Sequence, residues 1–326
     1  MTNRILAFGI CFTGYRELYC CGDTITGEVV LELGQDTKIE SIDLCISGVC
    51  DVHLHSKCTV QAEYQADDDA CPLRAREIYF EKSLQLYPSK SANEDTLLKV
   101  GRHAFYFEAS LPATNLPNSF EGSLGYVRYV AKSILQTSQT ELEAKRAFTL
   151  LGDTYDINLN QGSLERFNVS RSYIPTHFWF RGKGAVKAVA TVPRVAYCAG
   201  EEIPMSLDIT NDSGHKVKKI TATFLQSMFC RIGRKTKTSV KQMSSLEFKE
   251  IREEKRSTRS SELIRIPAVA PSNLVNCDLI ELAYELVISV AVTTMVMTKK
   301  IVFRIPIEVG NVPLQNNPEK NGNTLT

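Results

Sequence analysis

Apolar and polar residues alternate at every second position in several long stretches of the chain. Between residues 280 and 292 the even-numbered positions are all apolar, while the odd-numbered positions include Glu281 and Glu285. The same alternation recurs over residues 42–54, where Asp51 falls on the polar face, and over residues 203–210. A period of two is typical of strands that bury one face. We therefore expect strands at all three places, with residues 280–292 forming one long strand or two joined by a bend.

Helical patterns are scarce in the sequence. The best helical candidate is the short segment SQTELEAKRAF, residues 138–148. The chain also holds 14 Phe and 12 Tyr, together with many Val, Ile and Thr, which are residues that favour strands. These features predict an all-β fold in which antiparallel sheets pack face to face.

One segment occurs twice. YCCGDTI, residues 19–25, returns 178 residues later as YCAGEEI, residues 197–203, and the apolar pattern matches without a gap over about 28 positions. A slip of one residue would turn every buried side chain outward, so an ungapped match indicates two halves of like fold. Cys21 corresponds to Ala199, so the position requires a small side chain rather than a thiolate. The shared Gly followed by an acid predicts a turn.

Composition limits the kinds of protein that this chain can be. Its 326 residues suffice for two domains, and a net charge of +1 argues against a general nucleic-acid binder. Ten cysteines are present without a C-x-x-C pair, so the usual zinc and thioredoxin motifs are missing and the cysteines fit a reducing cytosol. The apolar segment 279–297 contains Glu281 and Glu285, which argue against a membrane span.

Few residues suggest catalysis or metal binding. His53 and His55 point from one face of a strand with Cys58 nearby, but a metal needs three or four convergent ligands, so we favour solvent-facing strand residues. Asp153 and Asp156 are interpreted as turn and strand-end residues. The chain has no G-x-S-x-G, H-E-x-x-H or Walker A motif. We expect no enzyme activity, no cofactor and no metal.

A basic segment is the strongest candidate for binding. Residues 231–260 hold ten Lys or Arg against four Glu. Arg234, Lys235, Lys237 and Lys241 could meet anionic lipid headgroups or a phosphorylated receptor tail. The alternative is a solvated strand face and loop, the usual role of such runs.

The middle of the chain carries its most distinctive motif. In LPATNLPNSFEGSLGYVRYVAKSIL, residues 111–135, two Leu-Pro pairs predict an ordered loop from which Phe120 can enter the core. This segment resembles the arrestin family, and the α-arrestins most closely, whose N-terminal domain carries LPxSFEGxxGxVRYxV. YCCGDTITGEVVLEL, FTLLGDTYDINLN and three later segments are similar to other parts of that family in the same order.

The resemblance implies two tandem arrestin-type immunoglobulin-like β-sandwich domains. The N-terminal domain would span residues 1–160 and the C-terminal domain residues 178–310. A hinge or linker at 161–177 would join them, and residues 311–326 would be a disordered tail.

The resemblance also implies a function. Arrestins are non-enzymatic adaptors that bind cytoplasmic parts of membrane receptors or transporters and direct their endocytosis, sorting or ubiquitination. Such a protein is cytoplasmic and lies peripherally at the plasma membrane and endosomes. Where the visual and β-arrestins carry a phosphate-sensing lysine pair this chain has Arg4 alone, so Arg4 and Arg128 are its phosphate-binding candidates. Arg128 has an alternative role, as the ion-pair partner of an acid on a neighbouring strand.

The chain departs from the α-arrestin pattern in one respect. Many α-arrestins recruit WW-domain HECT ubiquitin ligases through PPxY motifs, but this sequence has no Pro-Pro pair. We expect an adaptor of another sort, a tail-less form, or a competitor that occupies cargo without ubiquitinating it. Two other readings remain: a structural sandwich subunit of a sorting coat, similar to the arrestin-like subunit of retromer, and an extracellular adhesion sandwich or metal-dependent enzyme.

Overall fold

The computed structural model describes residues 5–54, 73–88, 97–159, 162, 165–174, 184–248, 257–293 and 297–314. The chain forms two compact units. Unit 1 comprises Met1–Asp153 together with the later segments Cys230–Lys237 and Leu274–Ile280, and unit 2 comprises Thr154–Phe229, Thr238–Asn273 and Glu281–Thr326.

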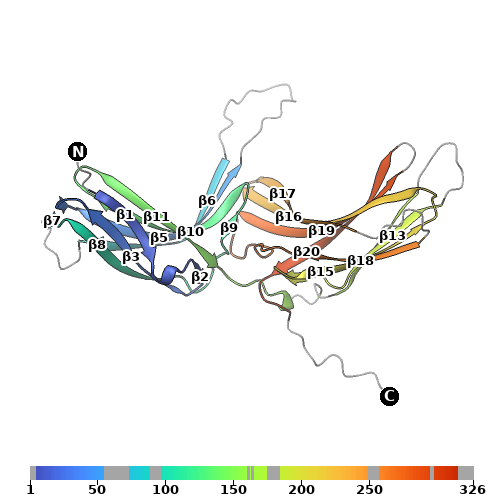
Figure 1. Cartoon of the computed structure of the whole chain (residues 1–326), viewed down its shortest axis with the longest axis horizontal. Helices are drawn as coiled ribbons and strands as arrows, with labels where there is room; N and C mark the ends of the chain where they lie inside the picture. Colours follow the sequence, from blue (N-terminus) through green and yellow to red (C-terminus); the bar gives the residue numbers. More distant parts are fainter. Residues whose placement is uncertain are drawn as a thin grey trace, which may run out of the picture. The chain divides into compact units, whose positions relative to one another are not determined.

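The strands of unit 1 form two main sheets in the described part of the chain (Figure 1). One has the order β1-β3-β8, and the other has the order β2-β11-β10-β5-β6 with β9 paired to β10. β4 and β7 form a separate short pair. The elements are β1 (Ile5–Phe12), η1 (Thr13–Tyr15), β2 (Leu18–Cys20), β3 (Thr24–Leu33), β4 (Thr37–Lys38), β5 (Ser41–Leu54), β6 (Leu73–Tyr87), β7 (Leu97–Leu98), β8 (Gly101–Ser110), β9 (Phe120–Glu121), β10 (Gly125–Gln136) and β11 (Glu141–Leu151).

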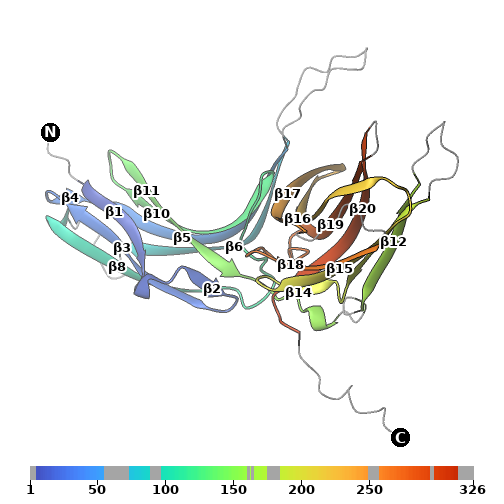
Figure 2. The ribbon, with the colours of Figure 1, turned by 45° about the vertical axis from the view of Figure 1, so that its right-hand side comes forward.

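The later elements form two further sheets (Figure 2). Their strand orders are β12-β13-β15-β18 and β14-β20-β19-β16-β17. The elements are η2 (Ile157–Leu159), β12 (Phe167–Tyr173), β13 (Val186–Val192), β14 (Ala196–Cys198), β15 (Glu202–Asn211), β16 (Lys216–Ile232), β17 (Lys235–Glu247), β18 (Ser257–Arg265), β19 (Ile280–Thr293) and β20 (Thr298–Gly310).

The predicted alternation is confirmed in the long strands. Along β19 every even-numbered residue from Ile280 to Val292 is buried, and the whole segment is one strand without a bend. β5 and β15 bury every second side chain in the same way. One exception is Asp51, which we expected on the polar face of β5 and which is only 1% exposed.

The best helical candidate, residues 138–148, is not a helix, because residues Glu141–Leu151 form strand β11. Residues 141–148 of this strand pair with β10, and residues 149–151 pair with β2. The ladder hydrogen bonds to β10 outweigh the weak helical preference of Glu, Ala and Lys. A second difference lies in the expected linker, 161–177, where Phe167–Tyr173 form β12 and pair with β13.

The two halves of the chain share one strand order, as the repeat predicted. β14 and β15 begin and end 178 residues after β2 and β3. β2-β11-β10-β5-β6 in the first half corresponds to β14-β20-β19-β16-β17 in the second. In both halves the short first strand of this order pairs in parallel with its neighbour.

The Leu-Pro loop between β8 and β9 is ordered by its own core contacts. Leu111, Leu116 and Phe120 are buried, which confirms that Phe120 enters the core. The hydroxyl of the buried Tyr129 donates a hydrogen bond to the carbonyl oxygen of Pro117 at 2.7 Å. The proline-rich segment is therefore tied to the centre of β10.

Candidate functional site

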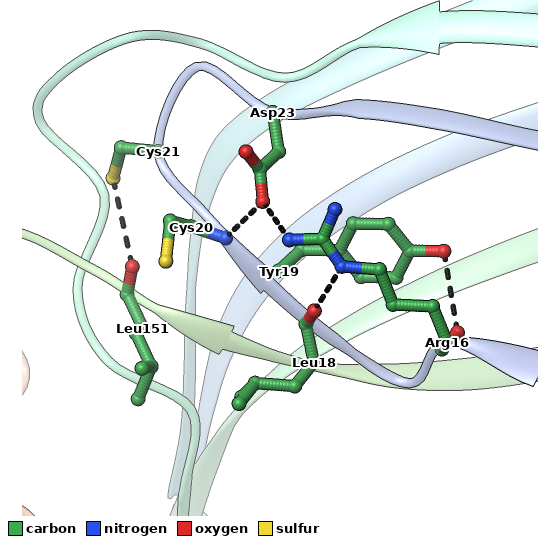
Figure 3. Close-up of polar contacts among 7 residues, drawn as sticks. All are labelled: Arg16, Leu18, Tyr19, Cys20, Cys21, Asp23 and Leu151. Carbon is green, nitrogen blue, oxygen red and sulfur yellow. Dashed lines mark hydrogen bonds and ion pairs between the residues drawn. The ribbon is translucent and has the colours of Figure 1, made fainter.

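The repeated segment of unit 1 is a turn held by one carboxylate (Figure 3). Asp23 accepts hydrogen bonds from the backbone N–H of Cys20, at 2.8 Å, and from the guanidinium of Arg16. That guanidinium lies 4.7 Å from the ring centre of Tyr19 and also donates from Nε to the carbonyl oxygen of Leu18 at 2.7 Å. The hydroxyl of Tyr19 donates to the carbonyl oxygen of Arg16 at 3.2 Å.

The second copy reproduces these contacts. Glu201 accepts from the backbone N–H of Cys198 at 2.7 Å and from Arg194 at 3.1 Å. The Arg194 guanidinium lies 4.5 Å from the ring centre of Tyr197, and the Tyr197 hydroxyl donates to the carbonyl oxygen of Arg194 at 3.0 Å. Since the same contacts hold with Ala199 in place of Cys21, the motif is a structural corner, and the predicted turn is confirmed.

Cys21 has the environment of an unreactive thiol. Its Sγ atom lies 3.6 Å from Oδ1 of Asp153. It also lies 4.0 Å from the carbonyl oxygen of Leu151, the contact drawn in Figure 3. Burial, followed by the negative charge of Asp153, raises the pKa of the Cys21 thiol to about 11. Because the thiolate is the nucleophilic and metal-binding form, this cysteine is not poised for chemistry near neutral pH.

Asp153 and Asp156 have the turn roles that we expected. Asp153 accepts from the backbone N–H of Asn115 at 2.9 Å and from the amide of Asn276 at 2.7 Å. Asp156 accepts from the backbone N–H and the side-chain amide of Asn158, at 2.9 and 2.6 Å. Both carboxylates are engaged by neutral donors that fix the backbone.

Arg128 takes the alternative role foreseen for it. Its Nε and Nη2 atoms donate to the two carboxylate oxygens of Glu121, at 2.6 and 2.8 Å, across the β9–β10 pairing. Its guanidinium also lies 3.7 Å from the ring centre of Tyr126. The hydrogen bonds to Glu121 raise the pKa of Arg128 above its ordinary value. The edge of the Arg128 guanidinium is therefore occupied by Glu121 and its face by the ring of Tyr126.

Four of the five remaining basic candidates lie around one hairpin. Arg4 lies outside the described residues. Arg234 is exposed in the turn before β17, and Lys235, Lys237 and Lys241 lie on β17 at positions that share one face of the strand. Lys235 and Lys241 are exposed and Lys237 is half-buried. Within the described residues, β17 is the last strand of its sheet.

His53 lies beside a buried carboxylate. Its Nε2 atom is 3.0 Å from Oδ1 of Asp51, and Arg74 donates from Nε to both oxygens of that carboxylate, at 3.0 and 3.2 Å. The hydrogen bonds from Arg74 hold the pKa of Asp51 below its ordinary value. His55 and Cys58, the other members of the metal hypothesis, lie outside the described residues.

One group that sequence reasoning missed is Cys50, Glu77 and Cys277. Their potential ligand atoms all lie within 4.8 Å of one another, and they are the one such group of three found among the described residues. Cys277 is 227 positions from Cys50, so no local spacing joins them. The available signal was that Cys50 belongs to the buried face of β5.

None of the helices in the described part of the chain has the length and apolar character needed to cross a bilayer. The segment first considered as a span, residues 279–297, contains the half-buried strand β19.

Comparisons with known proteins agree over almost the whole chain. The family model for the N-terminal domain of arrestin (or S-antigen) matches residues 8–158, and the model for its C-terminal domain matches residues 182–314. Arrestin domain-containing protein 4 of Homo sapiens is 24% identical over 313 residues, which cover 95% of this chain and 72% of that protein. Thioredoxin-interacting protein of Mus musculus is 24% identical over 318 residues, covering 95% and 75%.

Proposed function

This chain belongs to the arrestin family, and we propose that it is a non-enzymatic adaptor that binds cytoplasmic parts of membrane receptors or transporters and directs their endocytosis, sorting or ubiquitination. The observation that carries the proposal is the presence of both arrestin domains in tandem, with relatives such as arrestin domain-containing protein 4 aligned over nearly the full chain.

A surface suited to cargo lies on strand β17. An edge strand can accept an extended peptide as an added strand, because its backbone N–H and C=O groups pair with those of the incoming chain. Lys235, Lys237 and Lys241 stand on one face of β17, and Arg234 precedes it in the turn. We propose that these cations attract acidic or phosphorylated side chains of a cytoplasmic tail.

The test is quantitative affinity purification from cells. The wild-type chain is compared with a variant in which Arg234, Lys235, Lys237 and Lys241 are changed to Gln. The matched control is Lys299→Gln with Lys300→Gln, which removes two exposed cations from β20. We expect the wild type and the control to recover receptors or transporters, and the β17 variant to recover fewer.

The result separates the parts of the proposal. Cargo recovered together with a WW-domain ligase would support a role in ubiquitination, and cargo alone would support sorting or endocytosis. Recovery of coat subunits in fixed proportion would favour the coat-subunit alternative. Equal recovery by the wild type and the β17 variant would remove β17 from the proposal. Enrichment of neither membrane proteins nor ligases would overturn the adaptor function.

A membrane contact by the same residues is a separate outcome. Anionic lipids attract basic segments by about 1 kcal/mol per Lys or Arg near the surface. Flotation with liposomes containing phosphatidylserine, at low and at physiological salt, tests this directly. Lipid binding would be assigned to β17 if the β17 variant lost binding to the liposomes and the Lys299/Lys300 control bound them as the wild type does.

A further inference from the structure

Two thiols and a carboxylate meet within unit 1. Cys50 on β5 and Glu77 on β6 are direct partners in the antiparallel ladder, so their side chains stand on the same face of the sheet. Cys277, in the turn before β19, belongs to the segment Leu274–Ile280 of the same unit. Cys50 is fully buried, and the other two side chains are half-buried. The arrangement therefore lies beneath the surface.

The turn that carries Cys277 is fixed on both sides of that residue. The N–H of Cys277 donates to the carbonyl oxygen of Leu274 at 3.0 Å. Asn276 has a left-handed backbone, with a φ of 64°, and its amide donates to Asp153 at 2.7 Å. On the other side, the N–H of Asp278 donates to Oε2 of Glu77 at 3.2 Å. These contacts hold the Cys277 thiol against β5 and β6 without help from a ligand.

The carboxylate of Glu77 is held by neutral hydrogen-bond donors. Among the residues that the structure describes, no Lys or Arg forms an ion pair with this carboxylate. Its donors are the backbone N–H groups of Asp278 and Leu279 and the hydroxyl of Tyr79, the last at 3.3 Å. A half-buried carboxylate beside two thiols is unfavourable unless a positive charge compensates it. A divalent cation would supply that charge.

The spacing of the two sulfurs, which share a hydrogen bond in the metal-free site, fits a zinc ion. In a tetrahedral site with Zn–S bonds of about 2.3 Å, two thiolate sulfurs lie about 3.8 Å apart. The Sγ atoms of Cys50 and Cys277 are 3.8 Å apart, far beyond the length of a disulfide bond. Thiolates favour soft or borderline metals, and an added carboxylate suits Zn²⁺ better than Cu(I).

We propose that Cys50, Glu77 and Cys277 bind one Zn²⁺ ion, with a water molecule as the fourth ligand. Each thiol gives up its proton to solvent when the ion binds, so that two thiolates and one carboxylate face the metal. Tyr79, whose hydroxyl hydrogen-bonds to Glu77, orients the carboxylate from outside the coordination sphere.

The test uses the full chain, reduced with a phosphine and freed of metal. Zn²⁺ is titrated against a chromophoric chelator, and Co²⁺ is added separately, since cobalt bound by thiolates in tetrahedral geometry gives a charge-transfer band and intense visible bands. The variants are Cys50→Ser, Cys277→Ser and Tyr79→Phe. The matched control is Cys198→Ser, which removes a buried free thiol of unit 2.

We expect the wild type and Cys198→Ser to bind one Zn²⁺ per chain and to show the cobalt–thiolate band. Cys277→Ser removes a proposed ligand, so it should lose the cobalt–thiolate band and weaken zinc binding by more than about 100-fold, the largest effect typical of residues outside the coordination sphere. Tyr79→Phe changes only such an outer residue and should weaken zinc binding about tenfold. Should Cys50→Ser fail to fold, Cys277→Ser and the cobalt spectrum of the wild type still decide. Absence of the band in the wild type, or equal zinc binding in Cys277→Ser, would overturn the proposal.

Discussion

Tyr19 and Tyr197 occupy the same position in the two halves of the chain, and each donates its hydroxyl to the carbonyl oxygen of the arginine three residues earlier. In each copy that arginine also covers the tyrosine ring. The acid that follows the glycine differs, Asp23 in one copy and Glu201 in the other, yet each accepts from a cysteine N–H and from the arginine. The two copies therefore share their side-chain contacts as well as their amino-acid sequence.

Tyr197→Phe should lower the free energy of unfolding by about 1 kcal/mol, because it removes a hydrogen bond from a fully buried side chain and leaves the Arg194 carbonyl without that donor. Thermal and urea unfolding measure the change. Tyr106→Phe is the matched control, since Tyr106 is 80% exposed on β8 and should tolerate the loss of its hydroxyl. Equal effects of the two substitutions would contradict the role of the corner.

Gly200→Ala should destabilise the protein by about 1–2 kcal/mol, because residue 200 has a φ of +91° and a side chain disfavours that backbone. A Cβ atom at this position would meet nothing within 4 Å, so the loss would come from the backbone alone. Gly200→Asn should cost less, since Asn tolerates left-handed backbone. At Gly9 the space is equally open and φ is ordinary, so Gly9→Ala should leave the melting temperature unchanged or slightly raised.

Arg128→Gln should leave binding to an acidic or phosphorylated peptide unchanged, because Glu121 and Tyr126 already engage the guanidinium. Lys235→Gln combined with Lys241→Gln should weaken that binding and reduce its dependence on salt. Fluorescence anisotropy with one labelled peptide at several salt concentrations compares the two variants. A larger loss in Arg128→Gln would return Arg128 to the candidate phosphate site.

Asp51→Asn should destabilise the protein at neutral pH by about 1.5–3 kcal/mol, because it removes the charge that accepts hydrogen bonds from Arg74. The pKa of Asp51 is lowered in the folded state, so its stabilisation is present above the unfolded value of about 3.9 and is lost as the pH falls through the lower folded value. The gap in melting temperature between wild type and variant should therefore close below about pH 4.

The control for this pH dependence is Asp36→Asn. Asp36 also has a lowered pKa, through its hydrogen bond with Lys99, but it lies on the surface. Solvent screens such a pair, so the variant should differ little from wild type at any pH. An Asp51→Asn gap that stayed constant from neutral to acidic pH would show that the carboxylate acts by packing alone.

Periodicity predicted the strands well where each strand buries one face. β19 and β15 were identifiable because their polar and apolar positions follow the pleat. β11 was the best helical candidate because its charged residues have good helix propensity, and the pairing with β10 that decides its state is invisible in the segment itself. Asp51 was placed in solvent because its partner Arg74 comes from the next strand.

The binding candidates were predicted less completely for the same reason. The lysines of β17 form a local pattern, so their shared face could be read from the spacing. For Arg128, the sequence allowed us to predict an ion pair with an acid on a neighbouring strand, but it did not identify that acid as Glu121. The meeting of Cys50 with Cys277 depends on the path of the whole chain, and no pattern within either segment signals it.

The parallel pairs β2–β11 and β14–β20 bear on how the protein is made. In each pair a strand near the start of a half hydrogen-bonds to the strand of the same sheet that comes last in the sequence, so neither sheet is complete until that late strand has been made. Unit 1 also takes in the segments Cys230–Lys237 and Leu274–Ile280. During synthesis, when domains generally fold from the N-terminus onward, these contacts of unit 1 can form only after residues made long after its own sheets. Ribosome-bound chains that end before residue 230 would hold unit 1 with those contacts unmade.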